Sequence, residues 1–384
     1  MLVALVGTTP AKNGPTYYTR ERVAEAKRNL ERYEWARKVR KRIFETGDRI
    51  RYYCGPKYTS ADKYAAQSDD FIWLLQPTTK IARVVPDARR ALCPVHGAKV
   101  KRYNAWCPYN IEPISHPYQI QCMMGKEWYP SNKYHEGDMT SGRFPDDGNG
   151  IVVNGERYYA LREYARMVYG SVVVPTLSAL SQAYQLSGEP KYARKGCILL
   201  ARLATQYPNY GWEADSSLGL SAQPRLENRF DRTYLGPWNN QHPHYTWKHG
   251  GMITGLIWET FLLEATAYAY DGLYDYMDKD PSMIAFLRKK GMPIENGKEL
   301  REYIETYIFR AAMRALLKRE IEGNEGHHQA AAMAVALVMD DYGDIHPNSK
   351  DMVDYTWHGR GNAAHVMINA LTRDGGGHES PNYG

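Results

Sequence analysis

The sequence predicts a mainly α-helical fold: an incomplete α/α toroid of antiparallel helix pairs, preceded by long irregular loops. Apolar residues recur at helical spacing through much of residues 158–384, and short turns join successive helical stretches. No alternating apolar and polar pattern is long enough for a sheet domain. We therefore expect an N-terminal helix in residues 1–48, a loop-rich segment in 49–157 that packs on the toroid, and the toroid in 158–384.

The first helix has clear start and stop signals. Thr19 is the expected N-cap, the helix runs to about Glu45, and Gly47 stops it. Its apolar stripe is discontinuous and consists of Val23, Leu30, Tyr33, Val39 and Ile43. After it, the stretch from Arg49 to about Asn154 is rich in Pro, Gly, Tyr and Trp and has a helical period only near Ala61–Leu75. Long loops in a folded protein usually have a function or are held in place by a cross-link such as a bound metal ion.

A metal ion could hold these loops. The motif C-P-V-H-G places Cys93 and His96 three residues apart, the spacing of half a zinc ribbon, and I-Q-C-M-M-G-K adds a soft ligand at Cys122. The position three residues after Cys122 is Gly125, which cannot bind a metal. Cys107 or His116 would have to complete the shell, so the sequence leaves open both a structural zinc and the relic of a former site.

From residue 158 onward the helical pattern is regular. The turn S-G-E-P at Ser187–Pro190 predicts an αα-hairpin, whose first helix is expected to be interrupted near Gly170 and Pro175. The helices are expected at Tyr159–Leu186, Lys191–Tyr207, Lys248–Tyr276, Gly297–Glu322, His327–Asp341 and Lys350–Thr372.

Composition narrows the classes of partner. The net charge of +6 favours an anionic ligand but is too small to indicate nucleic acid, and no basic block lacks interleaved acidic residues. The 31 tyrosines and 9 tryptophans, against 7 phenylalanines, suit a cleft in which sugar rings stack, although many of them also fit half-buried helix positions. No apolar run is long enough to span a membrane, the apolar start is too short for a complete secretory signal, and five cysteines do not describe a disulfide framework.

The motif most suggestive of chemistry is G-N-E-G-H-H-Q at Gly323–Gln329, directly before an alanine-rich apolar run. Asn324 is a candidate cap of the following helix, and on a helix it would lie one turn from His328 and face the same way. A neutral amide beside an imidazole that exchanges protons near neutral pH suits a carboxylate-bearing substrate. A capped helix with a satisfied histidine explains the same residues. The glycine-rich terminal segment D-G-G-G-H-E-S-P-N-Y-G, which carries Tyr383, favours the chemical interpretation.

These segments resemble the heparinase II/III-like polysaccharide lyases. The resemblance is carried by the hairpin L-S-A-L-S-Q-A-Y-Q-L-S-G-E-P-K-Y-A-R-K-G-C-I-L-L, by N-E-G-H-H-Q-A-A-A-M-A-V-A-L-V-M-D-D and by the terminal tyrosine segment, with M-G-K-E-W-Y-P-S-N-K-Y similar to the loops that precede the toroid. It implies β-elimination at a uronic acid of an acidic polysaccharide, with no cofactor required for the chemistry. It also implies a secreted or periplasmic protein.

The resemblance implies a role for each site residue. Asn324 would neutralise the substrate carboxylate, and Tyr383 would protonate the departing sugar oxygen. His328 would be the base for one uronate epimer. For the other epimer Tyr383 would be the base too, which requires positive charge nearby, and Arg373 is a candidate. His327 lies near the same face as His328, and only the family spacing favours His328.

Further contacts to substrate are expected from two loops. Glu379 is either a second acid or, as we favour, a hydrogen-bonding brace. The segment before residue 248 supplies candidate cleft residues, which loop packing would explain equally well: Trp238, His242, His244 and Tyr245.

The sequence departs from the family pattern at its end, and two other functions are alternatives. Complete relatives continue into further helices and a β-sandwich domain, whereas this sequence stops at Gly384; we favour a missing C-terminal portion over a truncated product. A glycoside hydrolase on a helical toroid and a non-catalytic glycan-binding relative are the alternatives. The candidate hydrolase acids are Glu213, Asp215, Glu259 and Glu379.

Overall fold

The computed structural model describes residues 12–49, 58–77, 93–104, 108–207, 256–317, 321, 326–339, 346–359 and 362–369. This part of the chain is mainly helical, as predicted, and its strands are only two or three residues long. No described helix combines the length and the apolar character needed to cross a bilayer.

The N-terminal region forms two helices, α1 (Arg20–Arg32) and α2 (Glu34–Lys41), followed by a π-helical turn, Arg42–Thr46. The predicted cap is confirmed, because the Thr19 hydroxyl accepts a hydrogen bond from the Arg22 N–H at 3.3 Å. Gly47, with φ 71°, ends the region as predicted. The single long helix was wrong in one respect: Tyr33 has an extended backbone that separates α1 from α2.

The predicted apolar stripe of this region is only partly buried: Val23, Leu30, Val39 and Ile43 are half-buried. The buried side chains of the region are Ala36 and Phe44, which lie outside that stripe, and Phe44 packs with Leu180 and Tyr192 of the helical hairpin. Tyr33, in contrast, is exposed. The break at Tyr33 turns the helix axis, so a stripe drawn for one continuous helix does not face one surface.

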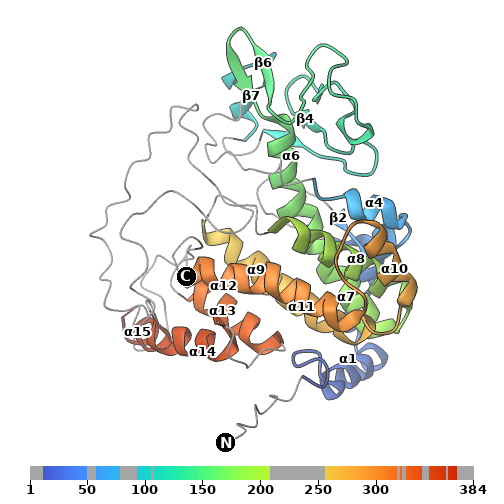
Figure 1. Cartoon of the computed structure of the whole chain (residues 1–384), viewed down its shortest axis with the longest axis vertical. Helices are drawn as coiled ribbons and strands as arrows, with labels where there is room; N and C mark the ends of the chain where they lie inside the picture. The colour runs from blue at the N-terminus through green and yellow to red at the C-terminus, as the bar shows by residue number, and fades with distance from the viewer. Residues whose placement is uncertain are drawn as a thin grey trace, which may run out of the picture.

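The loop-rich segment contains short elements, of which β4, β6 and β7 lie at one end of the molecule, whereas α4 lies beside α8 (Figure 1). Its helices are α3 (Ala61–Ala65), α4 (Asp69–Leu74) and 3₁₀ turns at Ala98–Arg102 and Tyr134–Glu136. The strands form an antiparallel β1–β2 pair, a β3–β4–β5 sheet and a β6–β7 hairpin. Their bounds are Asp48–Arg49, Tyr58–Thr59, Tyr109–Asn110, Ile120–Cys122, Trp128–Tyr129, Ile151–Val153 and Glu156–Tyr158.

The helical region begins with the predicted hairpin. It consists of α6 (Ala160–Val168), a π-helical turn (Tyr169–Val173), α7 (Val174–Ser187) and α8 (Pro190–Gln206). Gly188 ends α7 in the left-handed conformation with φ 74° and donates its N–H to the Tyr184 carbonyl at 2.7 Å. The interruption expected near Gly170 is this π-helical turn.

The later helices pack on this hairpin and on one another. α7 contacts both α8 and α9, and α13 contacts both α9 and α14. Their bounds are α9 Leu256–Leu273, α10 Pro281–Lys289, α11 Gly297–Ile304, α12 Ala311–Leu317, α13 His327–Val338, α14 Ser349–His358 and α15 Ala363–Asn369. The expected helix Lys350–Thr372 is therefore two helices that are interrupted after His358, and a π-helical turn separates α11 from α12. α10 was not predicted.

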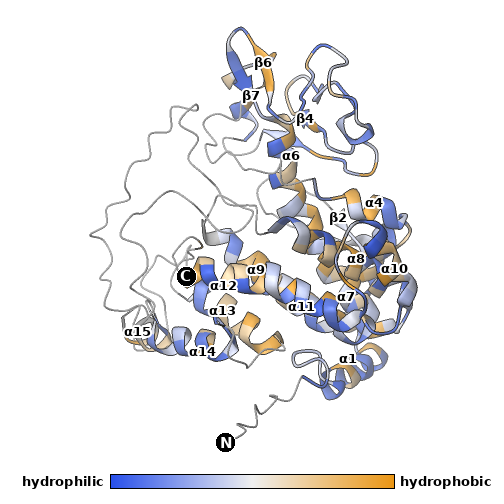
Figure 2. Cartoon of the chain, viewed as in Figure 1, coloured by the Kyte–Doolittle hydropathy of each residue, from blue (hydrophilic) through white to orange (hydrophobic). Residues whose placement is uncertain are grey.

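One hydrophobic cluster joins the loop-rich segment to the helices. It runs from Tyr64 and the β-strand residues Tyr109 and Ile120 through α8 and α9 to Tyr355. Figure 2 shows hydrophobic residues concentrated on α8 and α9, whereas α11 and α14 carry more hydrophilic residues. The loops thus share a core with the helices and do not form a separate domain with its own core.

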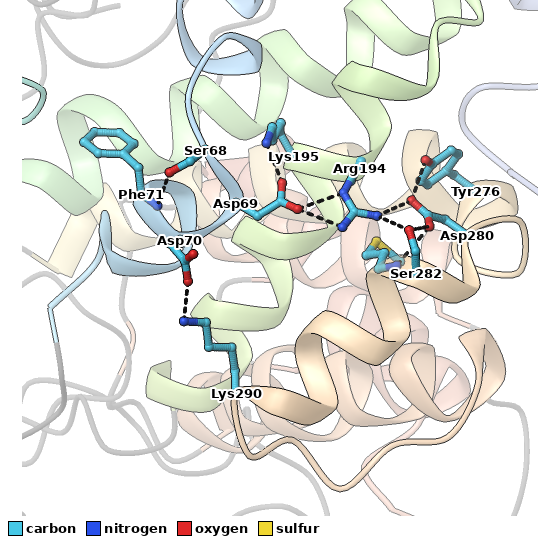
Figure 3. A network of polar contacts seen from close by, with 11 residues as sticks. Ser68, Asp69, Asp70, Phe71, Arg194, Lys195, Tyr276, Asp280, Ser282 and Lys290 are labelled. Atoms are coloured by element: carbon cyan, nitrogen blue, oxygen red, sulfur yellow. Dashed lines mark hydrogen bonds and ion pairs between the residues drawn. The ribbon is translucent and has the colours of Figure 1, made fainter.

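An ion-pair network holds α4 and α10 against α8 (Figure 3). The Arg194 guanidinium lies between two carboxylates, 2.7 Å from Asp69 and 2.7 Å from Asp280. Lys195 pairs with the other oxygen of Asp69, and Lys290 reaches Asp70 at 2.5 Å. Because these charges come from three helices, the network fixes the helices relative to one another.

Candidate functional site

Helix α13 begins at His327, with Gly326 as the N-cap at φ 93°. The Gly326 N–H donates to the Gln329 side-chain oxygen at 3.0 Å, which satisfies one backbone donor at the helix start. The prediction that Asn324 caps this helix was wrong, because the cap position belongs to Gly326. Asn324 itself lies outside the described residues, so its expected position beside His328 stays a prediction.

The two histidines of this first turn face different helices. The His327 ring lies 4.4 Å from the Phe261 ring of α9, whereas the His328 ring lies 6.4 Å from the Tyr355 ring of α14. Both imidazoles are half-buried. Consecutive helix residues point about 100° apart, so the two imidazoles would approach a bound substrate from different directions.

A pocket of about 400 Å³ lies between α7, α9 and the segment around Arg42 and Thr59. Arg42 and Glu264 bring opposite charges to it, and Phe261, the neighbour of His327, forms part of its wall. Neither histidine lines it. The pocket is therefore adjacent to the α13 start, but it is not built from the predicted catalytic residues that the structure describes.

Glu259, a candidate hydrolase acid, is a buried structural group. It is 1% exposed, and its Oε1 accepts hydrogen bonds from the Tyr169 and Tyr207 hydroxyls, each at 3.0 Å. Burial raises the pKa of Tyr207, so its hydroxyl remains a donor at neutral pH. A carboxylate enclosed in this way has no access to a glycosidic bond.

Most of the predicted chemical residues lie outside the described part of the chain. These are the catalytic candidates Asn324 and Tyr383, the alternative acids Glu213 and Asp215, and the substrate-contact candidates Trp238, His242, His244, Tyr245, Arg373 and Glu379. Of the proposed catalytic set, the structure places His328, and of the substrate contacts it places His327.

The predicted metal ligands come together in the loop-rich segment. The His96 Nδ1 lies 3.4 Å from the Cys93 Sγ and 3.6 Å from the Cys122 Sγ, and the ligand atoms of the three residues all lie within 4.8 Å of one another. Sulfur and nitrogen ligands of one tetrahedral zinc ion lie roughly 3.5 Å apart, given bonds of about 2.3 and 2.0 Å. These residues could therefore hold a metal ion without a change of backbone.

Two similar turns present the two cysteines. In the first, the Gly97 N–H donates to the Cys93 carbonyl at 2.8 Å and Gly97 has φ 55°. In the second, the Lys126 N–H donates to the Cys122 carbonyl at 2.9 Å and Lys126 has φ 66°. The second turn joins β4 to β5, so the β-hairpin fixes the direction of the Cys122 side chain.

The equivalence of the turns locates the missing ligand. His96 precedes Gly97 in the first turn, and Gly125 holds the same place in the second turn. His116, which was expected as a substitute, does not join the group: its ring stacks on Trp128 at 3.8 Å. Cys107, the other substitute, lies outside the described residues.

The surroundings of the thiols suit metal binding. The Cys93 thiol lies 3.4 Å from the Tyr129 hydroxyl, and the N–H groups of Gly125 and Met124 point to the Cys122 sulfur. Burial raises the pKa of the Cys122 thiol, and these two N–H groups oppose that increase in part. Donors of this kind also stabilise a metal-bound thiolate.

Comparisons of the chain with protein-family models, with curated proteins and with solved structures found no match.

Proposed function

We propose that the protein is a polysaccharide lyase of the heparinase II/III-like type that cleaves a uronate-containing polysaccharide by β-elimination. The observation that carries the proposal is the pair His327–His328 in the first turn of α13, directly after the N-E-G segment and half-buried between α9 and α14. The net charge of +6 also favours an acidic polymer.

The packing of the helices supports a proposal about the fold. The contacts of α7 with α8 and α9, and of α13 with α9 and α14, are those of successive packed helices. We propose that these helices form part of an α/α toroid whose cleft receives the polymer. A secreted or periplasmic location fits such a substrate.

The chemistry sets the roles of the residues. The proton beside a uronate carboxylate is too weakly acidic to leave while that carboxylate keeps its full charge, so a neutralising donor is needed, and the Asn324 amide takes this role. His328 removes the proton for one epimer. Tyr383 donates a proton to the leaving sugar oxygen and, with Arg373 nearby, removes the proton for the other epimer.

His327 is the matched alternative to His328. Its contact with Phe261 places it beside the pocket between α7 and α9, whereas His328 faces Tyr355. The resemblance favours His328 as the base, and His327 then contacts substrate. Replacing each histidine with glutamine in turn assigns the roles: the base variant loses turnover, and the contact variant mainly raises KM.

Ultraviolet absorbance of a digest tests the lyase proposal. β-Elimination leaves an unsaturated uronate that absorbs, whereas hydrolysis leaves none. The protein should be incubated with heparan, chondroitin, alginate and ulvan, while absorbance and new reducing ends are followed together. New ends without absorbance indicate a hydrolase, and binding without new ends indicates a glycan-binding protein.

We also propose that Cys93, His96 and Cys122 bind a structural zinc ion, which joins the two turns of the loop-rich segment. The carrying observation is the 3.4 and 3.6 Å separation of the His96 Nδ1 from the two sulfurs. Bound zinc would cross-link the turn that carries Cys93 and His96 to the β4–β5 hairpin that carries Cys122. Metal analysis of the purified protein, with Cys122→Ser as the comparison, tests this proposal: one zinc per chain is expected in the parent and none in the variant.

A further inference from the structure

We infer that Glu127 is the fourth ligand of this zinc site, so that two thiolates, one imidazole and one carboxylate hold the ion. The inference rests on the proposed zinc site and names a ligand that the sequence spacing does not indicate. Carboxylate oxygen is an accepted zinc ligand alongside cysteine and histidine. Structural zinc sites are almost always four-coordinate, and the three-residue group alone leaves one position unfilled.

The strand register places Glu127 beside Cys122. In the β4–β5 hairpin, Ile120 pairs with Tyr129 and Gln121 pairs with Trp128. The next step sets Cys122 opposite Glu127, and the Cys122 N–H donates to the Glu127 carbonyl at 2.9 Å. Residues directly opposite in an antiparallel pair project from the same face, with Cβ atoms about 5 Å apart. The Glu127 side chain therefore leaves the hairpin on the side of the Cys122 sulfur.

The Glu127 carboxylate also occupies the space of the missing side chain. A Cβ atom built on Gly125 would lie 2.1 and 2.2 Å from the two Glu127 carboxylate oxygens. Gly125 is the position that corresponds to the ligand His96 in the other turn. The glycine leaves room for this carboxylate. Glu127 can therefore supply the ligand that position 125 lacks.

Glu127 lies next to the site, although its carboxylate is not among the ligand atoms that lie within 4.8 Å of one another. Its Oε1 lies 3.8 Å from the His96 Nε2. The side chain is 39% exposed as a whole, yet its Oε2 is buried and has no hydrogen-bond partner among the described residues. A buried carboxylate oxygen without a donor is costly unless a cation or a proton satisfies it. A zinc ion between the sulfurs and His96 would be that cation.

A second role for Glu127 is distinguishable by experiment. Because its Oε1 faces the His96 Nε2 while Nδ1 faces the sulfurs, Glu127 could orient the imidazole and never touch the ion. As a ligand it turns from Nε2 toward the ion. The two roles differ once another ligand fills the fourth position, because a ligand then becomes redundant and an orienting group does not.

The test is a double-variant cycle on zinc affinity in the full chain. Zinc dissociation constants are measured by competition with a chromophoric chelator for the parent, Glu127→Gln, Gly125→Cys and the double variant. Gly125 has no left-handed φ, and the atoms that its new side chain meets belong to the mobile end of Glu127, so Gly125→Cys is accommodated. Cys107→Ser is the control for the other candidate ligand. Circular dichroism without metal checks that every variant folds.

We expect Glu127→Gln to weaken zinc binding about 100-fold or more in the parent, above the roughly 10-fold effect at the lower end for outer-shell groups. In the Gly125→Cys background, the same change should cost less than about 3-fold, because the new thiolate holds the fourth position. With Co²⁺ in place of zinc, thiolate charge-transfer absorption should increase in Gly125→Cys and stay unchanged in Glu127→Gln.

Other results overturn the inference. If Glu127→Gln weakens zinc binding equally in the parent and in Gly125→Cys, Glu127 orients His96 and does not bind the ion. If Glu127→Gln keeps the zinc affinity of the parent, or if Cys107→Ser loses much of it, another group holds the fourth coordination position. Zinc binding by Gly125→Cys but not by the parent shows that the site lacks a fourth ligand. Binding by neither protein rejects the zinc site itself, which is a separate failure.

Discussion

Lys12 Nζ lies 2.7 Å from Asp271 Oδ1, and the two side chains are only 3% and 0% exposed. Asp271 also accepts hydrogen bonds from the backbone N–H groups of Thr16, Tyr17 and Tyr18 at 2.8, 2.9 and 2.9 Å. This single carboxylate in the last turn of α9 therefore fixes the chain that precedes α1.

Replacing Asp271 with asparagine should lower the free energy of unfolding by about 3 kcal/mol, because a buried lysine loses its counter-charge. Denaturant titration measures the change. Glu25→Gln is the matched control: its pair with Arg28 is about half exposed, so its effect should stay within roughly 0.5 kcal/mol. Similar effects for the two variants would show that the N-terminal segment is not anchored by Asp271.

The network of Figure 3 predicts acid sensitivity. Burial would raise the pKa of Asp280, but hydrogen bonds from Ser282, Arg194, the Met283 N–H and Tyr276 outweigh burial and lower the pKa to about 2. In the unfolded chain the pKa of an aspartate is about 4. The contribution of Asp280 to stability is therefore present above pH 4 and is lost as pH falls from about 4 to 2.

Urea unfolding of the parent and of Asp280→Asn tests this window. Asparagine still caps α10, so the comparison isolates the charge. The parent should be more stable at pH 6, and the difference should shrink as pH falls toward 2. A difference that stays constant across this range would mean that the carboxylate charge contributes nothing.

Zinc should stabilise the folded protein by mass action. At a free concentration of about 100 times the dissociation constant, the ion should add roughly 2.7 kcal/mol to the free energy of unfolding. His96→Ala should abolish this increment. Cys197→Ser should retain it, because Cys197 is a buried thiol in α8 outside the metal group. An increment in His96→Ala as large as that of the parent would place zinc elsewhere.

Local signals in the sequence predicted the helix ends well. Thr19 and Gly188 act through hydrogen bonds within four residues, so their roles are visible in sequence alone. α10 was missed although Asp280 and Pro281 form a typical start signal. The start of α13 at His327 was predicted correctly, but its cap was not, because Asn324 is a better cap by residue type than Gly326, which holds the position.

The metal group illustrates the limit of spacing arguments. The separation of Cys93 and His96 predicted one half of the site, and Cys122 was found by its chemistry. Glu127 was missed because its closeness to His96 and Gly125 depends on the β4–β5 register and on the meeting of two turns. His116 was a reasonable substitute by type, but its ring stacks on Trp128. Such tertiary relationships carry no signal in a single sequence.

The catalytic proposal depends on an amide and a phenol that act on one uronate. The most direct measurement is the rate of double-bond formation on the preferred uronate polymer by the parent, Asn324→Ala and Tyr383→Phe at matched fold stability. Each variant should lose at least about 100-fold in turnover, the lower range for a lost acid or oxyanion-type donor. Near-parental rates in both variants would contradict the assignment of this site.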